Sequence, residues 1–179
     1  ARGACGYSVH PLFAVSDKYH SYRELTDVFF TLEGTAFRLD HMLTWLKDAG
    51  LKVQQIDSQY KPVYHAAASI VSNQVVALFA EAQAMLMTCG FQPETAMEAL
   101  KKIFLGNAHH IAEVGPVQAL TGPVQRGDAA TVAKHIAVLD NPKDKLLYIL
   151  LSERLVEIAA AGKDDYPEQA MKELLQEKY

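Results

Sequence analysis

The sequence predicts an α+β protein in two parts, a short α/β part followed by an all-helical part. Short β-prone runs bounded by Pro or Gly occur only in the first 58 residues. Residues 63–89 then contain neither Pro nor Gly, which is typical of one long helix. Beyond Gly90 the apolar residues recur at helical spacing. We therefore divide the chain into domains at residues 1–58 and 59–179.

The first part has the order strand, strand, helix, strand. Residues 5–12, 28–33 and 51–56 are β-prone, and the first of these runs ends at Pro11 before a loop. Residues 35–49 carry apolar side chains at helical spacing and are followed by Gly50, which ends the helix. The polar and aromatic residues 17–26 are predicted to form an irregular connection.

The long helix begins with Pro62 at its first turn and is closed by Gly90. It is apolar on most of its circumference, so we expect it to be buried nearly all round by its own domain or by a partner chain. At about 100° per residue its polar side chains gather within about 120° of arc. They are Lys61, His65, Ser69, Ser72 and Asn73, with Gln83 further along.

Helices follow in order. We predict a helix from Pro93 to about residue 114, an irregular stretch at 115–128 with two Gly-Pro pairs, and a helix capped by Asp128 that runs to residue 139. Asn141-Pro142 begins another helix, which Gly162 ends, and a short last helix starts at Pro167.

Composition limits the partners. The formal charge of −4 without a Lys/Arg cluster argues against nucleic acid and against a membrane surface. The long apolar run is interrupted by four polar residues, Ser72, Asn73, Gln74 and Glu81. Cys5 and Cys89 have neither metal-site spacing nor a disulfide framework, which fits a reducing cytoplasm. The sequence shows no signal peptide and no initiator Met, so we expect a piece of a longer cytoplasmic protein.

Four motifs carry a resemblance to a known family. They are HPLFA at 10–14, LEGT at 32–35, KPVYHAAASIVSN at 61–73 and ALTGPVQRGDAATVAKH at 119–135. The chain resembles two-domain proteins that join a Rossmann domain to a helical domain labelled DUF2520. These are similar in architecture to 6-phosphogluconate dehydrogenase, ketopantoate reductase, pyrroline-5-carboxylate reductase and prephenate dehydrogenase.

The resemblance implies a dinucleotide enzyme. In such enzymes NAD or NADP sits on the Rossmann domain, and the substrate sits at the junction with the helical domain. This sequence departs from that pattern because the Gly-rich fingerprint that cradles the pyrophosphate is absent. We therefore expect the last strands of a Rossmann-type sheet followed by an all-α bundle like the C-terminal domain of 6-phosphogluconate dehydrogenase. NADP or NAD is expected for the full-length protein and no cofactor for this chain alone.

The predicted catalytic residues are Lys61, His65 and Asn73. Reduction of a carbonyl or imine needs a proton donor and groups that polarise and orient the substrate, and these side chains form such a set. Hydroxyacid dehydrogenases of similar architecture place a Lys and an Asn four residues apart, whereas here His65 follows Lys61 at that spacing. Whether Lys61 or His65 is the acid stays open. The structural alternative is a solvated Lys61 at a helix end and a hydrogen-bonded core His65.

Other residues are predicted to bind substrate. His10 precedes Pro11 at a strand end, where open α/β sheets bind ligands, and prephenate dehydrogenases carry a similar His-Pro with a working His. Ser69 and Ser72 lie beside the catalytic set, and Thr121 with Arg126 could clamp a carboxylate or phosphate. The alternatives are a structural loop His10 and a helix connector in which Arg126 pairs with Asp128. His109 and Glu113 offer only two metal ligands, so no metal site is predicted.

Two functions remain open at this stage. The first is an NAD(P)-dependent oxidoreductase of a small hydroxy, keto or imino acid, with this chain as its substrate-binding and dimerising half. The second is a non-catalytic nucleotide or metabolite sensor on the same scaffold. Either protein is expected to form a homodimer through the helical domain, because the apolar helices exceed what one small helical layer can cover.

Overall fold

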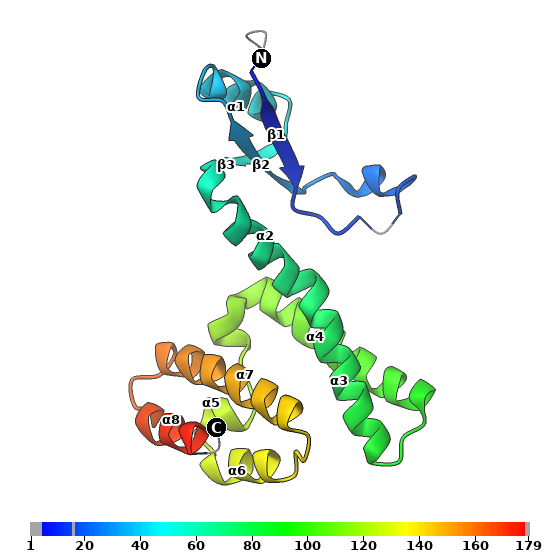
Figure 1. Cartoon of the computed structure of the whole chain (residues 1–179), viewed down its shortest axis with the longest axis vertical. Helices are drawn as coiled ribbons and strands as arrows, with labels where there is room; N and C mark the ends of the chain where they lie inside the picture. The colour runs from blue at the N-terminus through cyan, green and yellow to red at the C-terminus, as the bar shows by residue number, and fades with distance from the viewer. Residues whose placement is uncertain (1–4, 16, 178–179) are drawn as a thin grey trace. The chain divides into compact units, whose positions relative to one another are not determined.

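The computed structural model describes residues 5–15 and 17–177. The chain divides into two compact units, Ala1–Leu78 and Phe79–Tyr179 (Figure 1). Among these described residues, strands occur only in the first unit, as the sequence predicts. The compact units nevertheless meet at residue 78 rather than residue 58, because the first turns of the long helix contact the sheet. The α+β class is confirmed.

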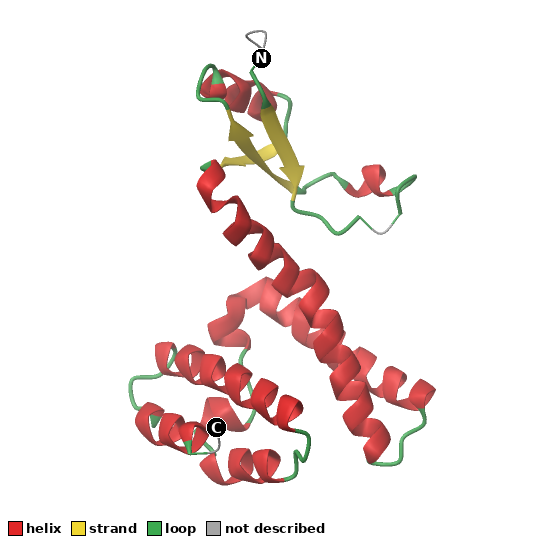
Figure 2. Ribbon diagram, in the orientation of Figure 1, coloured by secondary structure: helices red, strands yellow, loops and turns green. Residues whose placement is uncertain are grey.

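The first unit is built on a three-stranded mixed sheet (Figure 2). Strands β1 (Tyr7–Pro11), β2 (Phe29–Gly34) and β3 (Lys52–Gln55) lie in the order β1-β2-β3, so all three predicted strands are confirmed. β1 is antiparallel to β2, with Ser8 opposite Glu33 and His10 opposite Thr31. β2 and β3 are parallel, which requires the crossover that helix α1 (Leu39–Asp48) supplies.

A small hydrophobic core holds this unit together. Leu32, Leu46 and Val53 come from β2, α1 and β3, and all are buried. Helix α1 begins later than predicted because Arg38 adopts a left-handed conformation with φ 58°, which α-helical residues do not have. A 3-10 helix, η1 (Ser21–Glu24), lies in the connection predicted to be irregular.

The long helix contains a π-helical turn. After the 3-10 turn η2 (Ser58–Tyr60), α2 (Lys61–Ser69) is followed by the π-helical segment η3 (Ile70–Gln74) and then by α3 (Val75–Thr88). None of these three segments has a buried residue within the described chain, so burial of this helix by a partner chain stays a prediction. The apolar periodicity predicts that the helix is buried, but it does not show which chain buries it.

The same helical run has a second property that the sequence argument missed. Ser58–Thr88 is long and apolar enough to cross a membrane, with a mean hydropathy of 1.3 over 18 residues. Polar residues interrupt this run of apolar residues, but the mean hydropathy averages over them. Core helices of soluble proteins meet the same criterion, so length and composition alone decide nothing.

The described residues of the second unit form helices joined by short loops, with no strand. Helix α4 (Pro93–Ala119) is interrupted at Gly115, whose φ of 78° breaks it close to the predicted end at residue 114. Then come α5 (Pro123–Arg126), α6 (Ala129–Ala137), α7 (Pro142–Ala161) and α8 (Glu168–Gln176). Asp128 and Asn141 cap α6 and α7 as predicted, accepting bonds from the backbone N–H groups of Thr131 and Lys143. A buried cluster fills the centre of this unit: Val124, Val132, Ile136, Ile149, Val156, Met171 and Leu175.

Candidate functional site

Strand β1 and helix α2 meet through two pairs of side chains. Ser8 and His10 are two residues apart on β1, so strand alternation puts them on the same face of the sheet. Lys61 on α2 donates a hydrogen bond to Ser8 Oγ at 3.4 Å. One helical turn further, the hydroxyl oxygen of Tyr64 lies 3.0 Å from His10 Nδ1. Two residues along the strand thus match one turn along the helix.

Lys61 is committed to an ion pair. Its ammonium group donates a hydrogen bond to Glu33 Oε1 on β2, and the Glu33 residue is buried. The hydrogen bond from Lys61 lowers the pKa of Glu33 most, followed by a hydrogen bond from Ser58 and the charge of Lys61, against desolvation. This pairing holds the start of α2 on the sheet. A catalytic role of Lys61 stays a prediction.

His10, Tyr64 and His65 form a cluster of three rings. The His10 and Tyr64 rings meet edge to face, with centroids 5.7 Å apart. The His65 ring centroid lies 5.2 Å from that of His10 and 5.4 Å from that of Tyr64. Both imidazoles are exposed and Tyr64 is half-buried, so this cluster can reach a ligand from solvent. His65 is therefore not a core residue.

A cavity of about 280 Å³ adjoins this cluster. The end of β1 and the loop after it form one wall, from His10 to Ala14, and Ala68, Val71 and Ser72 form the other. Apart from His10 and Ser72 its lining is apolar. The Ser72 hydroxyl donates to the Ala68 carbonyl at 2.7 Å, so its oxygen is left as an acceptor for a ligand. Few polar groups in an apolar hollow are typical of small-molecule sites.

The remaining predicted residues of the long helix contribute less. Ser69 is half-buried and makes none of the side-chain hydrogen bonds found among the described residues. Asn73 is exposed, and its Oδ1 lies 3.4 Å from Ser72 Oγ, whose one hydrogen is directed to the Ala68 carbonyl. The structure brings together His10, His65 and Ser72, with Lys61 one turn away. Asn73 does not line the cavity.

Thr121 and Arg126 belong to the second unit, where their loop is held as a connector. Lys163 donates to the Gln125 carbonyl at 3.0 Å, and the Tyr166 hydroxyl donates to the Val124 carbonyl at 2.6 Å. Arg126 takes part in none of the ion pairs of the described chain, although its charge contributes to lowering the pKa of Asp128. Asp128 is occupied instead by Thr131, and hydrogen bonds from Thr131 are the main reason that the pKa of Asp128 is lowered.

Sequence reasoning missed two residues of this site, Glu33 and Tyr64. Glu33 stands opposite Ser8 in the β1–β2 register, and that register follows only once the strands are paired. Tyr64 lies three residues after Lys61, so the two side chains are neighbours on one face of the helix. Placing α2 against the Ser8 and His10 face of β1 would have identified Tyr64.

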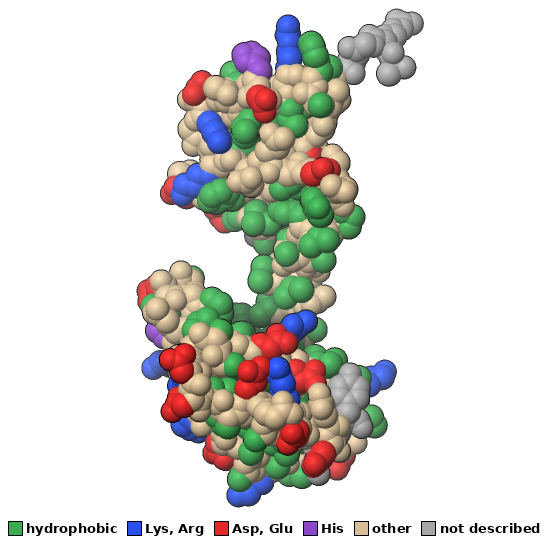
Figure 3. All heavy atoms as spheres, turned by 90° about the vertical axis from the view of Figure 1, so that its left-hand side faces the viewer, with side chains coloured by type: hydrophobic (Ala, Val, Ile, Leu, Met, Phe, Trp, Pro, Cys, Tyr) green, Lys and Arg blue, Asp and Glu red, His purple; other side chains and the backbone are tan. Residues whose placement is uncertain are grey.

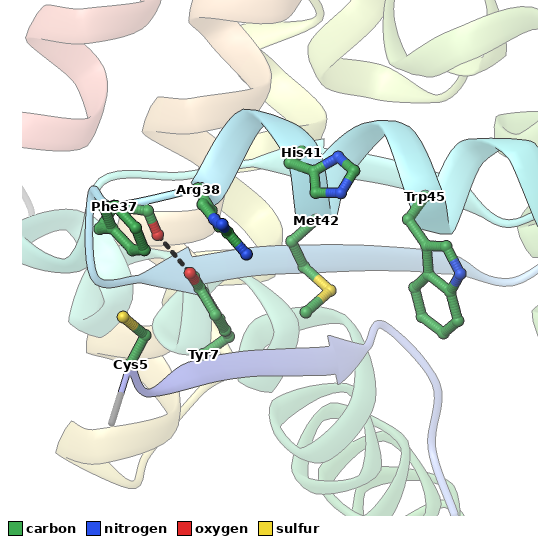
Figure 4. Close-up of a pocket in the computed structure, with 7 residues that line it drawn as sticks. All are labelled: Cys5, Tyr7, Phe37, Arg38, His41, Met42 and Trp45. Atoms are coloured by element: carbon green, nitrogen blue, oxygen red, sulfur yellow. Dashed lines mark hydrogen bonds between the residues drawn. The ribbon is translucent and has the colours of Figure 1, made fainter. Parts of the chain in front are cut away.

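A second cavity, of about 380 Å³, lies between the start of β1 and α1 (Figure 4). In it the Tyr7 hydroxyl donates to the Phe37 carbonyl, and the Arg38 guanidinium lies 5.3 Å from the centre of the Phe37 ring. His41, Met42 and Trp45 follow along α1. None of the predicted site residues lines this cavity.

The residues of the chain do not fit a dinucleotide pyrophosphate. The ten glycines include no two that are two positions apart, so the sequence has no G-x-G-x-x-G turn. Across residues 5–15 and 17–177, no group of three His, Cys, Asp or Glu side chains is placed to hold a metal ion.

The family described as "Domain of unknown function (DUF2520)" matches residues 28–155. No curated protein matches the chain. The structure is similar to protein TM1727 from Thermotoga maritima, with a TM-score of 0.69, 29% identity, and coverage of 87% of this chain and 62% of that one. It shares the fold of putative NADP oxidoreductase BF3122 from Bacteroides fragilis, with a TM-score of 0.56, 23% identity, and coverage of 73% and 50%. The chain therefore spans less than two thirds of either protein.

Proposed function

We propose, from the premise that this chain belongs to the DUF2520 family, that the protein is an NAD(P)-dependent oxidoreductase of a small hydroxy, keto or imino acid. This chain would supply the substrate-binding half. The observation that carries the proposal is the position of His10 at the end of β1, in a small apolar cavity shared with Ser72. A titratable group that faces a small, mostly apolar cavity is typical of an enzyme site.

The polarity of the cavity suggests the substrate class. Ser72 offers an acceptor for an amine or hydroxyl hydrogen, and an imidazole N–H of His10 can donate to a carbonyl or carboxylate oxygen. The apolar lining suits a short hydrocarbon side chain. A small acid with a hydroxyl, amino or imino group on the neighbouring carbon combines these features.

The cofactor proposal rests on the relatives. The Bacteroides fragilis protein that shares this fold is described as a putative NADP oxidoreductase. Since the residues of this chain do not fit a pyrophosphate, we assign no step of the reaction to the cofactor. We expect the 179-residue chain to bind neither NAD nor NADP with useful affinity. Calorimetry showing a micromolar dissociation constant would contradict this.

Within this chain, we assign proton transfer to the histidine cluster rather than to Lys61. An ammonium paired with a buried carboxylate would lose that pairing on giving up its proton. His10 lines the cavity, and His65 lies beside it. Lys61 is then a residue that holds α2 on the sheet.

The test is turnover by full-length protein with reduced or oxidised nicotinamides and a panel of small hydroxy, keto and amino acids. His10→Gln should lower kcat by about 10²–10⁴-fold, the usual contribution of a positioned acid or base. His135→Gln is the matched control, because His135 is an exposed histidine in the second unit that also bonds a tyrosine. No turnover with any substrate, or equal losses in both variants, would contradict the proposal.

A non-catalytic metabolite sensor is the second candidate. The ion pair between Lys61 and Glu33 favours a sensor, because the pairing removes one predicted catalytic group from the site. A sensor would bind a small acid in the same cavity without turning it over. In that case His10→Gln would weaken binding measured by calorimetry, and no nicotinamide oxidation would be seen with the wild-type protein.

We further propose a cytoplasmic homodimer formed through the helical unit. Helix α7 buries one face, with Ile149 and Val156, in the core of its own unit. Its other face exposes two leucine pairs at i and i+4, Leu146 with Leu150 and Leu147 with Leu151. Hydrophobic side chains are visible on the molecular surface (Figure 3), and on α4 Ile103 is 69% exposed. Exposed apolar side chains that share one helix face, as on α7, are typical of an interface.

A second copy suits this surface because an isologous contact covers the same apolar face on both chains. Sedimentation at micromolar concentration should show a dimer, and Leu147→Glu should give a folded monomer. The surface control is Glu153→Gln on the same helix. A wild-type monomer, or recovery of the protein with membranes, would contradict the proposal.

A further inference from the structure

The hydrogen bond between His10 and Tyr64 leaves one imidazole nitrogen free. Nδ1 of His10 is occupied, since it lies 3.0 Å from the Tyr64 hydroxyl oxygen. Nε2 is therefore the nitrogen that can exchange a proton with a ligand in the cavity that His10 lines. The direction of the bond decides which proton-transfer chemistry Nε2 can perform, because the two tautomers of neutral imidazole carry their hydrogen on different nitrogens.

We infer that Tyr64 is a positioning residue whose hydroxyl oxygen accepts the Nδ1–H of His10 and thereby keeps proton exchange at Nε2. The inference rests on the proposed function. If Tyr64 instead donated to Nδ1, neutral His10 would carry its hydrogen on Nε2, and giving up that hydrogen would create an imidazolate. With Nδ1–H held by Tyr64, His10 alternates between a cation and a neutral ring by gaining or losing one proton at Nε2.

The step is a proton transfer and nothing else. A carbonyl or imine substrate that is being reduced would develop negative charge on its oxygen or nitrogen. The Nε2–H bond of cationic His10 breaks, an O–H or N–H bond forms on the substrate, and His10 becomes neutral with its Nδ1–H bond unchanged. In the oxidation direction the neutral Nε2 takes the proton back.

The surroundings of His10 support this assignment. The titratable groups facing it are Tyr64 and His65 from α2, with the Lys61–Glu33 ion pair one turn away. His65 is in ring contact but makes none of the hydrogen bonds to His10 found in the described chain, so it does not compete for Nδ1. The edge-to-face packing of Tyr64 at 89° also fixes the ring plane of His10.

Nitrogen-15 NMR of histidine-labelled full-length protein tests the inference, with the His10 signal assigned by its loss in His10→Gln. Neutral His10 should be the Nδ1–H tautomer in the wild type and a mixture of tautomers in Tyr64→Phe. In the kinetic test, Tyr64→Phe should lower kcat about tenfold, roughly the value of one hydrogen bond, with little change in KM.

Tyr148→Phe is the matched control. Tyr148 makes the same kind of contact in the second unit, with its hydroxyl 2.8 Å from His135 Nδ1 and rings meeting at 88°. This variant should leave both the His10 signals and kcat unchanged. An Nε2–H tautomer in the wild type, or a His10 tautomer unaffected by Tyr64→Phe, overturns the inference whether or not the protein turns over. Absence of turnover in the wild type overturns the proposed function, and the tautomer measurement still decides the role of Tyr64.

Discussion

Replacing Leu32 by Ala tests whether the site depends on its own small core. Leu32 is fully buried on β2, between Thr31, which pairs with His10, and Glu33, which binds Lys61. The other buried members of its cluster are Leu46 and Val53. Shortening the side chain leaves a cavity, and the backbones of β2, β3 and α1 would have to move to close it.

The expected cost follows from that burial. Leu→Ala substitutions at fully buried positions lower the free energy of unfolding by about 2–5 kcal/mol, and a middle value of about 3 kcal/mol corresponds to a factor on the order of 100 in the opening equilibrium. The core clusters of the two units share no residue, so the loss should be confined to the first unit.

Amide hydrogen exchange read by mass spectrometry measures this separately for each unit. Peptides from β2 and α1 of Leu32→Ala should lose protection by on the order of 100-fold, while peptides from α7 keep theirs. Ile149→Ala, at a fully buried position of the other cluster, should give the mirror image. A loss below about tenfold in β2 would refute the burial argument, and an equal loss in α7 would show that the units open together.

Three further outcomes are expected. Because the pKa of Glu33 is lowered on folding, the unfolded chain binds more protons between the two pKa values, so stability is lost as pH falls through the folded pKa of Glu33. Thermal melts from neutral to acidic pH should show this loss, and Glu33→Gln should reduce the slope. Asn141→Ala removes the cap of α7 and should cost about 1 kcal/mol in urea unfolding, with Lys143→Gln as an exposed control. Gly127→Ala should lower the melting temperature, because Gly127 has φ +70° and an added Cβ would lie 2.5 Å from the Pro167 side chain; an unchanged melting temperature would show that the Pro167 loop yields.

Most of the fold could be predicted from local sequence signals. Asp128, Asn141 and Gly162 mark the ends of helices by their own chemistry, and the structure puts the boundaries there. The late start of α1 could not be predicted, because nothing about Arg38 indicates a left-handed backbone. The apolar pattern of the long helix predicts that it is buried but does not show whether its own chain or a partner buries it, and its own chain does not.

The site could be predicted only in part. His10, His65 and Ser72 were singled out from their residue types and positions, and the structure gathers them. Glu33 escaped notice because its partner Lys61 is 28 residues away and a strand paired in register is needed to connect them. Asn73 was placed on the same helix face as Lys61 and His65 by assuming 100° per residue. The π-helical turn at Ile70–Gln74 does not follow that spacing.

The π-helical turn also shows where the long helix can tolerate a change of length. A π turn takes one more residue than an α turn, so it is what remains when a helix absorbs a one-residue insertion without breaking. Removing one residue from Ile70–Gln74 should return the segment to ordinary α-helical bonding. The contacts of Lys61 and Tyr64 with β1 lie before that point and would be kept. Every residue from Val75 onward would turn by about 100° about the helix axis. The chain thus carries a place where its length can vary by one residue while the histidine cluster stays as it is.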